Sequence, residues 1–364
     1  MPAGLARRSL LGWTAALVTL PAGATREAEV TATPPIDGIE EWQDFLRLYV
    51  TEEGRVVDTA NHGTSHSEGQ GWGLLLAEAF DDERSFNRML GWARRELRRP
   101  SDNLMAWAWR PDRAVPVEDH NNATDGDIFV AWALQRAARR WQRPELLELG
   151  IRVAQDLHSA CVRELRGRMV LLPAAFGFEH RDHVVLNPSY YVIPAFGALA
   201  QLMPDGRWLA LRQDGLALLR EARFGRWGLP ADWISLSRHE ASPPSLPSGW
   251  PPRFSYDAVR VPLYLAWAGL EAEPAAQAAA RFWSSSPVTP AWTDLVQNNT
   301  APYPADSGFL AVAKLVHDPA AGPEFLPRVR QAPHYYAAAL TLLARLAAFE
   351  RPYAQADASR QRRL

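Results

Sequence analysis

The sequence predicts an all-α protein that folds as a single domain. From Glu40 onward, apolar residues recur with helical periodicity between clusters of Pro, Gly, Asp and Asn. Long stretches of alternating apolar and polar residues, which predict strands, are scarce. The chain has 364 residues, of which 47% are hydrophobic, so it can bury one large core.

The periodic segments divide the chain into about a dozen candidate helices at fairly even spacing. In the first half of the chain, the predicted helices cover residues 40–50, 68–79, 83–97, 125–141 and 144–165. In the second half, they cover residues 189–203, 208–222, 256–270, 273–283, 306–317, 323–330 and 333–349. No sequence repeat accompanies them, which argues against the helical-repeat families.

Several of these segments begin with local signals. Asp125 precedes a stripe that includes Ile128 and Trp132, Pro144 suits a first helical turn, and Ser255 precedes the segment at 256–270. A short hairpin is expected at about 169–185, and the Pro-rich stretch at 242–252 is expected to form an ordered surface loop.

The N-terminus has the pattern of an export signal over residues 1–24. Arg7 and Arg8 precede an apolar stretch at 10–20 that is too short for a comfortable membrane span, and small residues follow at 22–24. The arginine pair also matches a twin-arginine signal, which exports folded proteins, so the export route stays open. We expect a periplasmic or secreted protein with its folded domain at 25–350 and a flexible tail at 351–364.

The composition indicates which kind of molecule the protein binds. The formal net charge of −2 gives no overall attraction to nucleic acid or to anionic membranes, so a neutral partner is expected. The fifteen Trp residues can fill a core, and some can stack on sugar rings. The single cysteine, Cys161, excludes an intramolecular disulfide and is expected to be buried.

A glutamate among glycines opens the second predicted helix. Gly69, Gly71 and Gly73 follow Glu68, and each glycine costs a helix about 1 kcal/mol relative to alanine. Such glycines would let a bulky substrate approach the backbone next to the carboxylate. The alternative is that Glu68 only stabilises the N-terminus of the helix through its charge.

A second acidic segment, Asp125-Gly126-Asp127, opens the helix at 125–141. Asp125 is interpreted either as a plain N-cap or as a functional carboxylate. Two carboxylates at this spacing could suggest a metal, but the other ligands are missing and no His or Cys cluster has zinc spacing. The sequence therefore predicts neither a metal nor a cofactor.

The third acidic segment contains Asp257 and Arg260. On a helix, these residues could form an exposed i,i+3 ion pair worth a few tenths of a kcal/mol. However, Asp257 stands in an aromatic and aliphatic run, where the nearby arginine would keep it charged, as a general base must be.

Aromatic residues accompany these carboxylates. If their segment is extended, Trp107 and Trp109 face the same side and could form a platform for a sugar, while core packing is the alternative. Tyr190 stands in a further segment, Asn-Pro-Ser-Tyr-Tyr at 187–191.

The order of five segments resembles glycoside hydrolase family 8. Within the family, the chain is most similar to the periplasmic endoglucanase that accompanies bacterial cellulose synthase, through residues 53–58 and 229–233. The likeness covers nearly the whole mature chain, with mild departures at Gly71 and Trp72. The five segments are His-Ser-Glu-Gly-Gln-Gly (66–71), Leu-Met-Ala-Trp (104–107), Ala-Thr-Asp-Gly-Asp (123–127), Leu-Asn-Pro-Ser-Tyr (186–190) and Ser-Tyr-Asp-Ala-Val-Arg (255–260).

The resemblance implies an (α/α)6 barrel with an open cleft across the ends of its inner helices, and inverting hydrolysis of β-1,4 bonds. Glu68 would protonate the leaving oxygen, Asp257 would activate water, and Asp125 would hold the sugar at the cleavage subsite. The resemblance also implies that Arg260 and Tyr256 orient the base. The residues that it implies line the cleft are Trp107, Trp109 and Tyr190.

These roles have physical requirements. Inversion needs two carboxyl groups about 6.5–9.5 Å apart, with room for one water. Glu68 and Asp257 are distant in sequence, so only the closed fold can bring them to that separation. A desolvated setting should raise the pKa of Glu68, and Arg260 should keep Asp257 ionised.

The substrate and the biological role are less determined. The same barrel could act on chitosan, mixed-linkage glucan or xylan, and a non-catalytic protein that guides a glycan is a further alternative. A lone catalytic domain favours cellulose biosynthesis over cellulose degradation. The expected partners are β-1,4-glucan and, in biosynthesis, the cellulose synthase complex, with a monomer as the default state.

Overall fold

The computed structural model describes residues 36–239 and 241–361. The export signal predicted at 1–24 lies outside the described residues. Within the described part of the chain, no helix combines the length and the apolar character that crossing a membrane requires.

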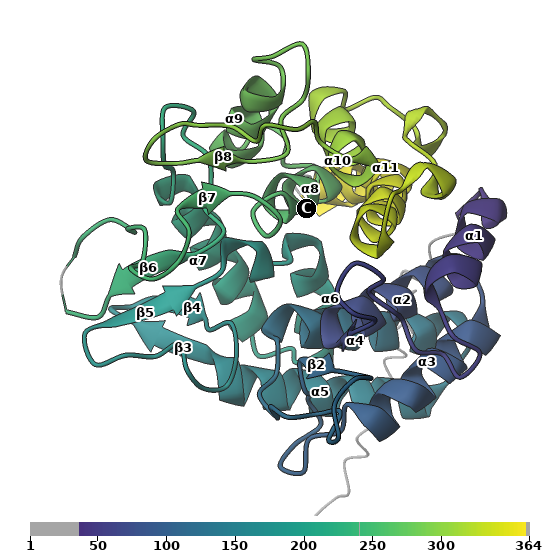
Figure 1. The fold of residues 1–364 in the computed structure, drawn as a ribbon. Coiled ribbons are helices and arrows are strands. Elements are labelled where there is room, and N and C mark those ends of the chain that lie inside the picture. The colour runs from purple at the N-terminus through teal and green to yellow at the C-terminus, as the bar shows by residue number, and fades with distance from the viewer. Residues whose placement is uncertain (1–35, 240, 362–364) are drawn as a thin grey trace, which may run out of the picture. The chain divides into compact units, whose positions relative to one another are not determined.

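A closed ring of inner helices forms the core of the fold (Figure 1). Helices α2 and α4 are buried along almost their whole length, and α8 is buried throughout. Each helix of the ring packs on the next, and α8 meets the chain just before α6 through the 3₁₀ helix η2 (Ile193–Ala195). The ring consists of α2 (Ser67–Ala79), α4 (Thr124–Arg140), α6 (Phe196–Leu202), α8 (Arg260–Trp267) and α11 (Tyr335–Gln361).

Amphipathic helices surround this ring. Each buries one face against the inner helices and leaves the other face to solvent, which explains the periodicity of the sequence. Side-chain caps fix some of their starts: Asp82 accepts a hydrogen bond from Ser85 N at 2.9 Å, and Asp306 caps its helix in the same way. The outer helices are α1 (Ile39–Tyr49), α3 (Glu83–Glu96), α5 (Pro144–Cys161), α7 (Arg207–Glu221), α9 (Pro274–Trp283) and α10 (Ser307–His317).

The strands in the described residues form four two-stranded antiparallel sheets. Figure 1 shows β3 to β6 gathered at one side of the helices. The pairs are β1 (Ser65–His66) with β2 (Ala108–Trp109), β3 (Val162–Leu165) with β4 (Arg168–Leu171), β5 (His183–Leu186) with β6 (Ile234–Ser237), and β7 (Arg253–Phe254) with β8 (Thr293–Asp294).

Two predictions about the segment around β3 to β5 are wrong. The predicted hairpin at 169–185 is absent, because β4 pairs backward with β3, and β5 pairs with the distant β6. The predicted helix at 144–165 ends at Cys161. The reason is a two-residue turn at Arg166 and Gly167, whose φ angles are 55° and 76°, since such turns join strands rather than extend a helix.

Prolines and a turn account for three further differences between the predicted and the observed helices. The predicted helix at 189–203 is divided into η1 (Pro188–Tyr190), η2 and α6, because Pro194 lacks an N–H and disfavours helix before it. The segment at 323–330 forms two 3₁₀ helices, η3 (Pro323–Phe325) and η4 (Val329–Gln331), with Pro327 between them. Helix α8 begins only at Arg260, after a turn at 256–259.

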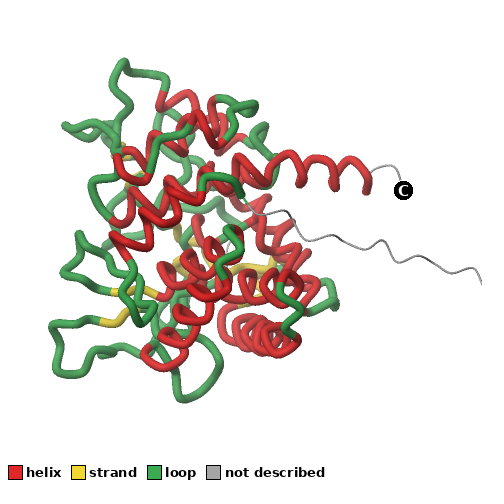
Figure 2. Tube along the Cα trace, turned by 90° about the vertical axis from the view of Figure 1, so that its right-hand side faces the viewer, coloured by secondary structure: helices red, strands yellow, loops and turns green. Residues whose placement is uncertain are grey.

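The C-terminal helix extends beyond the boundary predicted at 350. It contains Pro352 and continues to Gln361. Figure 2 shows its last turns projecting past the neighbouring helices.

The glycines beside Glu68 pack against protein, which corrects the expectation that they admit substrate. A Cβ on Gly71 would lie 2.8 Å from Gly126 O, and one on Gly69 would lie 2.5 Å from the Tyr335 hydroxyl. In return, a Cβ on Gly126 would lie 2.7 Å from the backbone N of Glu68. Helices α2 and α4 therefore touch backbone to backbone, and this close approach places Glu68 beside Asp125.

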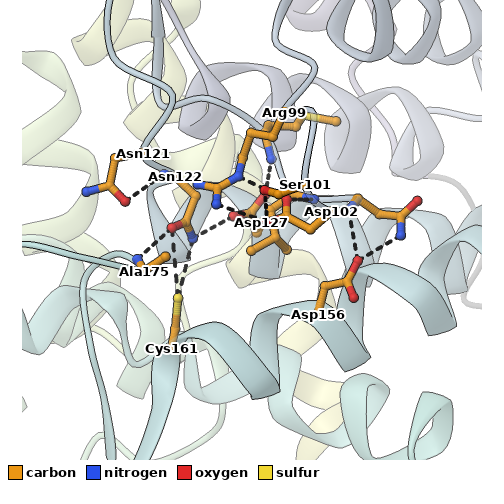
Figure 3. Close-up of polar contacts among 12 residues, drawn as sticks. Arg99, Ser101, Asp102, Asn121, Asn122, Asp127, Asp156, Cys161 and Ala175 are labelled. Carbon is orange, nitrogen blue, oxygen red and sulfur yellow. Dashed lines mark hydrogen bonds and ion pairs between the residues drawn. The ribbon is translucent and has the colours of Figure 1, made fainter.

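A buried polar network ties the loop at 104–123 to α4 and α5 (Figure 3). Asp127 accepts hydrogen bonds from Met105 N and from Asn122 Nδ2, both at 2.9 Å. Asn122 Oδ1 in turn accepts from Ala175 N at 2.8 Å, and its amide lies 3.5 Å from the Cys161 sulfur. Burial raises the pKa of Asp127 to about 7. The second carboxylate of the Asp-Gly-Asp segment thus organises a loop.

The close contact between α2 and α4 predicts that a methyl group added at Gly126 destabilises the fold. Gly126→Ala should lower the free energy of unfolding by about 1–3 kcal/mol, because its Cβ meets backbone atoms that cannot move independently. Gly91→Ala in α3 is the matched control, since nothing lies within 4 Å of its Cβ. It should raise the free energy of unfolding by about 0.5–1 kcal/mol. Urea unfolding measures both, and equal effects would contradict the close approach.

Candidate active site

The N-terminal ends of three inner helices converge on one cavity. Glu68 lies in the first turn of α2, Asp125 in the first turn of α4, and Arg260 is the first residue of α8. Asp257 stands in the turn just before α8. The cavity has a volume of about 230 Å³ and is lined by His66, Glu68, Trp107, Ala123, Asp125, Tyr190, Tyr256, Asp257, Arg260 and Tyr336.

Neither Glu68 nor Asp125 caps its helix. The N-cap positions are His66 and Ala123, and neither makes a side-chain cap hydrogen bond. Asp125 bonds locally to Gly126 N at 2.8 Å, while Glu68 bonds to Arg260. The interpretation of Asp125 as a plain N-cap is therefore wrong, while Glu68, in the first turn of α2, also pairs with Arg260.

Arg260 is the centre of the site. It is 3% exposed and donates from Nη1 to Glu68 Oε2 and from Nη2 to Asp257 Oδ1 at 2.8 Å. The same Nη2 donates to Ser189 Oγ at 2.8 Å and lies 3.5 Å from Asp125 Oδ2. One guanidinium therefore serves three carboxylates. The ion pair of Asp257 and Arg260 is part of this buried cluster, so the interpretation as an exposed helical pair is wrong.

This arrangement limits the separation of Glu68 and Asp257. Because both carboxylates accept hydrogen bonds from one guanidinium, their nearest oxygens lie at most about 8 Å apart by hydrogen-bond geometry. This bound overlaps the range of about 6.5–9.5 Å that an inverting pair requires.

The environment favours a proton on Glu68. Burial raises its pKa well above the ordinary value, and the charge and hydrogen bond of Asp125 raise it further, against the lowering effect of Arg260. A group that keeps its proton near neutral pH can act as a general acid.

The pKa of Asp257 departs from the expectation. We expected Arg260 to keep this carboxyl ionised, but burial outweighs the arginine and raises the pKa of Asp257 above its ordinary value. The reason is that Arg260 shares its charge among three carboxylates. Burial and the neighbouring Asp125 raise the pKa of Glu68 well above its ordinary range, which favours the proton on Glu68.

The two tryptophans expected to form one platform have different surroundings. Trp107 lines the cavity, its Nε1 donates to Asp119 at 2.9 Å, and its ring lies parallel to His66. Trp109 is not among the lining residues. It lies in strand β2 and packs edge-on against Trp92, with 5.8 Å between the ring centroids.

The two tyrosines predicted for the site both line the cavity. The Tyr190 ring lies 6.0 Å from the Arg260 guanidinium carbon. Tyr256 is 43% exposed and is held through its backbone carbonyl, which accepts a hydrogen bond from the Tyr336 hydroxyl. It therefore forms an aromatic wall open to solvent beside Asp257.

Sequence reasoning assigned no role to His66, Tyr336 and Asp232. His66 belongs to the segment at 66–71 that carries the family resemblance, but no signal distinguishes its side chain from its neighbours. Tyr336 stands at the start of a predicted helix, where an aromatic residue indicates packing. Asp232 contributed only to the resemblance, although it contacts the turn that carries Asp257.

A larger cavity lies elsewhere in the described part of the chain, away from these carboxylates. This cavity of about 540 Å³ lies between α9, α10 and η3, and its lining has no carboxylate. Among the residues that the structure describes, no group of three His, Cys, Asp or Glu side chains is arranged to hold a metal ion.

Comparison with known proteins shows relatives along almost the whole chain. Glycosyl hydrolases family 8 matches residues 14–350. A "Probable endoglucanase" of Novacetimonas hansenii is 42% identical over 322 residues, which is 88% of this chain and 93% of that protein.

Two solved structures have closely similar folds. The endo-β-1,4-glucanase CMCax of Acetobacter xylinum matches with a TM-score of 0.81 and 42% identity, over 86% of this chain and 98% of that chain. The endoglucanase Cel10 of Klebsiella pneumoniae, a family 8 glycosyl hydrolase, matches with a TM-score of 0.81 and 35% identity, over 87% and 99%. These matches confirm the predicted (α/α)6 barrel.

The raised pKa of Glu68 predicts a pH-dependent cost to stability. The folded state holds this proton more tightly than the unfolded chain, so stability falls as the pH rises above the ordinary glutamic acid pKa of about 4.3. Glu68→Gln removes this ionisation. The free energy of unfolding of the variant minus that of the wild type should therefore increase from about pH 4 to pH 7.

Urea unfolding at several pH values measures this difference. Glu148→Gln is the control, because its side chain is 71% exposed and its difference from the wild type should stay flat. A flat difference for Glu68→Gln as well would contradict the raised pKa.

Proposed function

The chain belongs to family 8 of the glycosyl hydrolases, and from this premise we propose that it is an inverting endo-β-1,4-glucanase that cleaves cellulose-like β-glucan. It is a glycoside hydrolase, and its relatives are named as endoglucanases. The observation that carries the proposal is that Glu68 and Asp257 face one cavity, on either side of a single guanidinium.

The proposed reaction needs one proton donor and one proton acceptor. Glu68 gives its proton to the glycosidic oxygen, and the bond from that oxygen to the anomeric carbon breaks. Asp257 takes a proton from a water, whose oxygen bonds to the anomeric carbon from the opposite face. The products are a sugar of inverted configuration, a protonated Asp257 and an ionised Glu68, which exchange protons with solvent.

Arg260 supports both steps in this proposal. Its charge stabilises the carboxylate that forms on Glu68 after the proton leaves, and it orients Asp257 through the 2.8 Å hydrogen bond. Asp125 lines the cavity and, in this proposal, accepts a hydrogen bond from a sugar hydroxyl, while the bond from Gly126 N orients its carboxylate. Trp107, Tyr190 and Tyr256 supply ring faces for stacking.

We also propose export to the periplasm or beyond, and a role in cellulose biosynthesis. The basic and apolar pattern at 1–24 supports export, and the similarity of residues 53–58 and 229–233 to the synthase-associated endoglucanase supports the role. In this role, a monomer would cut nascent glucan near the cellulose synthase complex.

The catalytic assignment predicts two inactive variants. Glu68→Gln and Asp257→Asn should each lower kcat on carboxymethyl cellulose by about 10²–10⁴-fold or more, because each removes a proton-transfer group. Both should keep the wild-type circular dichroism spectrum, and Glu148→Gln should keep full activity.

An activated substrate separates the two roles. An aryl cellooligosaccharide with a dinitrophenolate leaving group needs no protonation, so Glu68→Gln should recover most of its activity on it while Asp257→Asn should not. Proton NMR of the first-formed product should show the α-anomer. Near-normal turnover by either variant, or a first-formed β-anomer, would overturn the proposal, and preferential cleavage of chitosan or xylan would change the substrate.

The export proposal makes its own prediction. The full chain should be recovered from the periplasm or the medium, and deletion of residues 2–24 should leave active enzyme in the cytoplasm. Replacement of Arg7 and Arg8 by lysines should block export only if the twin-arginine route is used. Fractionation followed by an activity assay measures all three, and cytoplasmic retention of the full chain would refute export.

A further inference from the structure

Asp232 bonds to the turn that carries the base. It lies just before β6, and its Oδ1 accepts hydrogen bonds from Ser255 N at 2.9 Å and from Ala258 N at 2.8 Å. Its own backbone N donates to Arg253 O at 2.7 Å. One side chain thus joins the β6 segment to both sides of Asp257.

We propose that Asp232 is a positioning residue that holds the general base in place by accepting the amide hydrogens of Ser255 and Ala258. This inference rests on the proposed role of Asp257. Asp232 does not line the cavity, so its contact with the site is through this turn.

The turn needs such support because the helix does not hold it. Helix α8 begins at Arg260, and residues 256–259 form a turn in front of it. The turn contributes the hydrogen bonds from Val259 N to Ser255 O at 3.0 Å and from Arg260 N to Asp257 O at 3.1 Å. The amides of Ser255 and Ala258 donate to Asp232 and not to a carbonyl of the turn.

The position of a base is critical to catalysis. A displacement of about 1 Å in a reacting group can cost about 10²-fold in rate. The Arg260 hydrogen bond fixes the carboxylate of Asp257, whereas Asp232 fixes the peptide from which that carboxylate extends.

The contact does not require a charge on Asp232. Both amides bond to the same oxygen, as they would to the carbonyl oxygen of a protonated acid. Burial and the nearby charge of Asp257 raise the pKa of Asp232 to about 8, so the neutral form prevails at neutral pH. Asparagine offers the same carbonyl oxygen, so Asp232→Asn is the conservative variant and Asp232→Ala is the deletion.

The test compares kcat with KM for these variants of the full chain on a cellooligosaccharide. Asp232→Ala should lower kcat by about 10–100-fold with KM within about threefold, because Trp107, Asp125 and Tyr190 lie on other segments and stay in place. Asp232→Asn should retain kcat within about threefold. Asp182→Ala, at an exposed position, is the surface control. The loss in Asp232→Ala should be equal on the activated aryl substrate, since a misplaced base is not helped by a better leaving group.

Several outcomes would overturn the inference. The first is a kcat for Asp232→Ala within about twofold of the wild-type value. The second is a change in KM with kcat unchanged, and the third is an equal loss of kcat in the alanine and asparagine variants. If Asp232→Ala does not fold, Asp232→Glu tests the positioning role, because its extra methylene displaces the carboxyl oxygen that accepts the two amide hydrogens. An unchanged kcat in Asp232→Glu would refute that role. If Asp257→Asn remains active, the proposed function itself fails. If Asp257→Asn is inactive while Asp232→Ala is normal, only this inference fails.

Discussion

The active site depends on one buried positive charge shared among three carboxylates. Arg260 binds Glu68 and Asp257 directly and lies 3.5 Å from Asp125. With all three carboxylates ionised, the cluster would hold more negative than positive charge in a desolvated place. The state in which one carboxyl group keeps its proton therefore has the lower free energy. This shortage of positive charge is the physical reason that one carboxyl group can be an acid while a chemically similar neighbour is a base.

The fold produces this cluster by bringing the N-terminal ends of helices together. The first turns of α2 and α4 carry Glu68 and Asp125, where the helix dipole favours negative charge and partly offsets the cost of burial. Contact between Gly71 and Gly126 sets the distance between those helices. The same glycines weaken each helix alone, so the packed inner ring must compensate for them. Geometry at the site is therefore obtained at the expense of local helix stability.

The sequence predicted the parts of the fold that depend on periodicity. Outer helices such as α3 and α9 appear within about one residue of the expected ends, because their apolar stripes face one core. The interruptions were missed where a turn or proline overrides the pattern, as at Arg166 and Pro194. For the site, the order of motifs identified Glu68, Asp125 and Asp257. It could not show that Arg260 reaches Glu68, that Trp109 turns to Trp92, or that Asp232 holds the base turn, because these contacts join segments distant in sequence.

The buried Cys161 has a consequence for how this enzyme tolerates its surroundings. It is fully enclosed beside Asn122, and it is the only thiol in the sequence. Folding therefore requires no oxidant, and the chain has no intramolecular disulfide that a reductant could break. The same tertiary structure is accessible in reducing and in oxidising compartments, so the redox state of its environment places no constraint on where the chain acquires its native state.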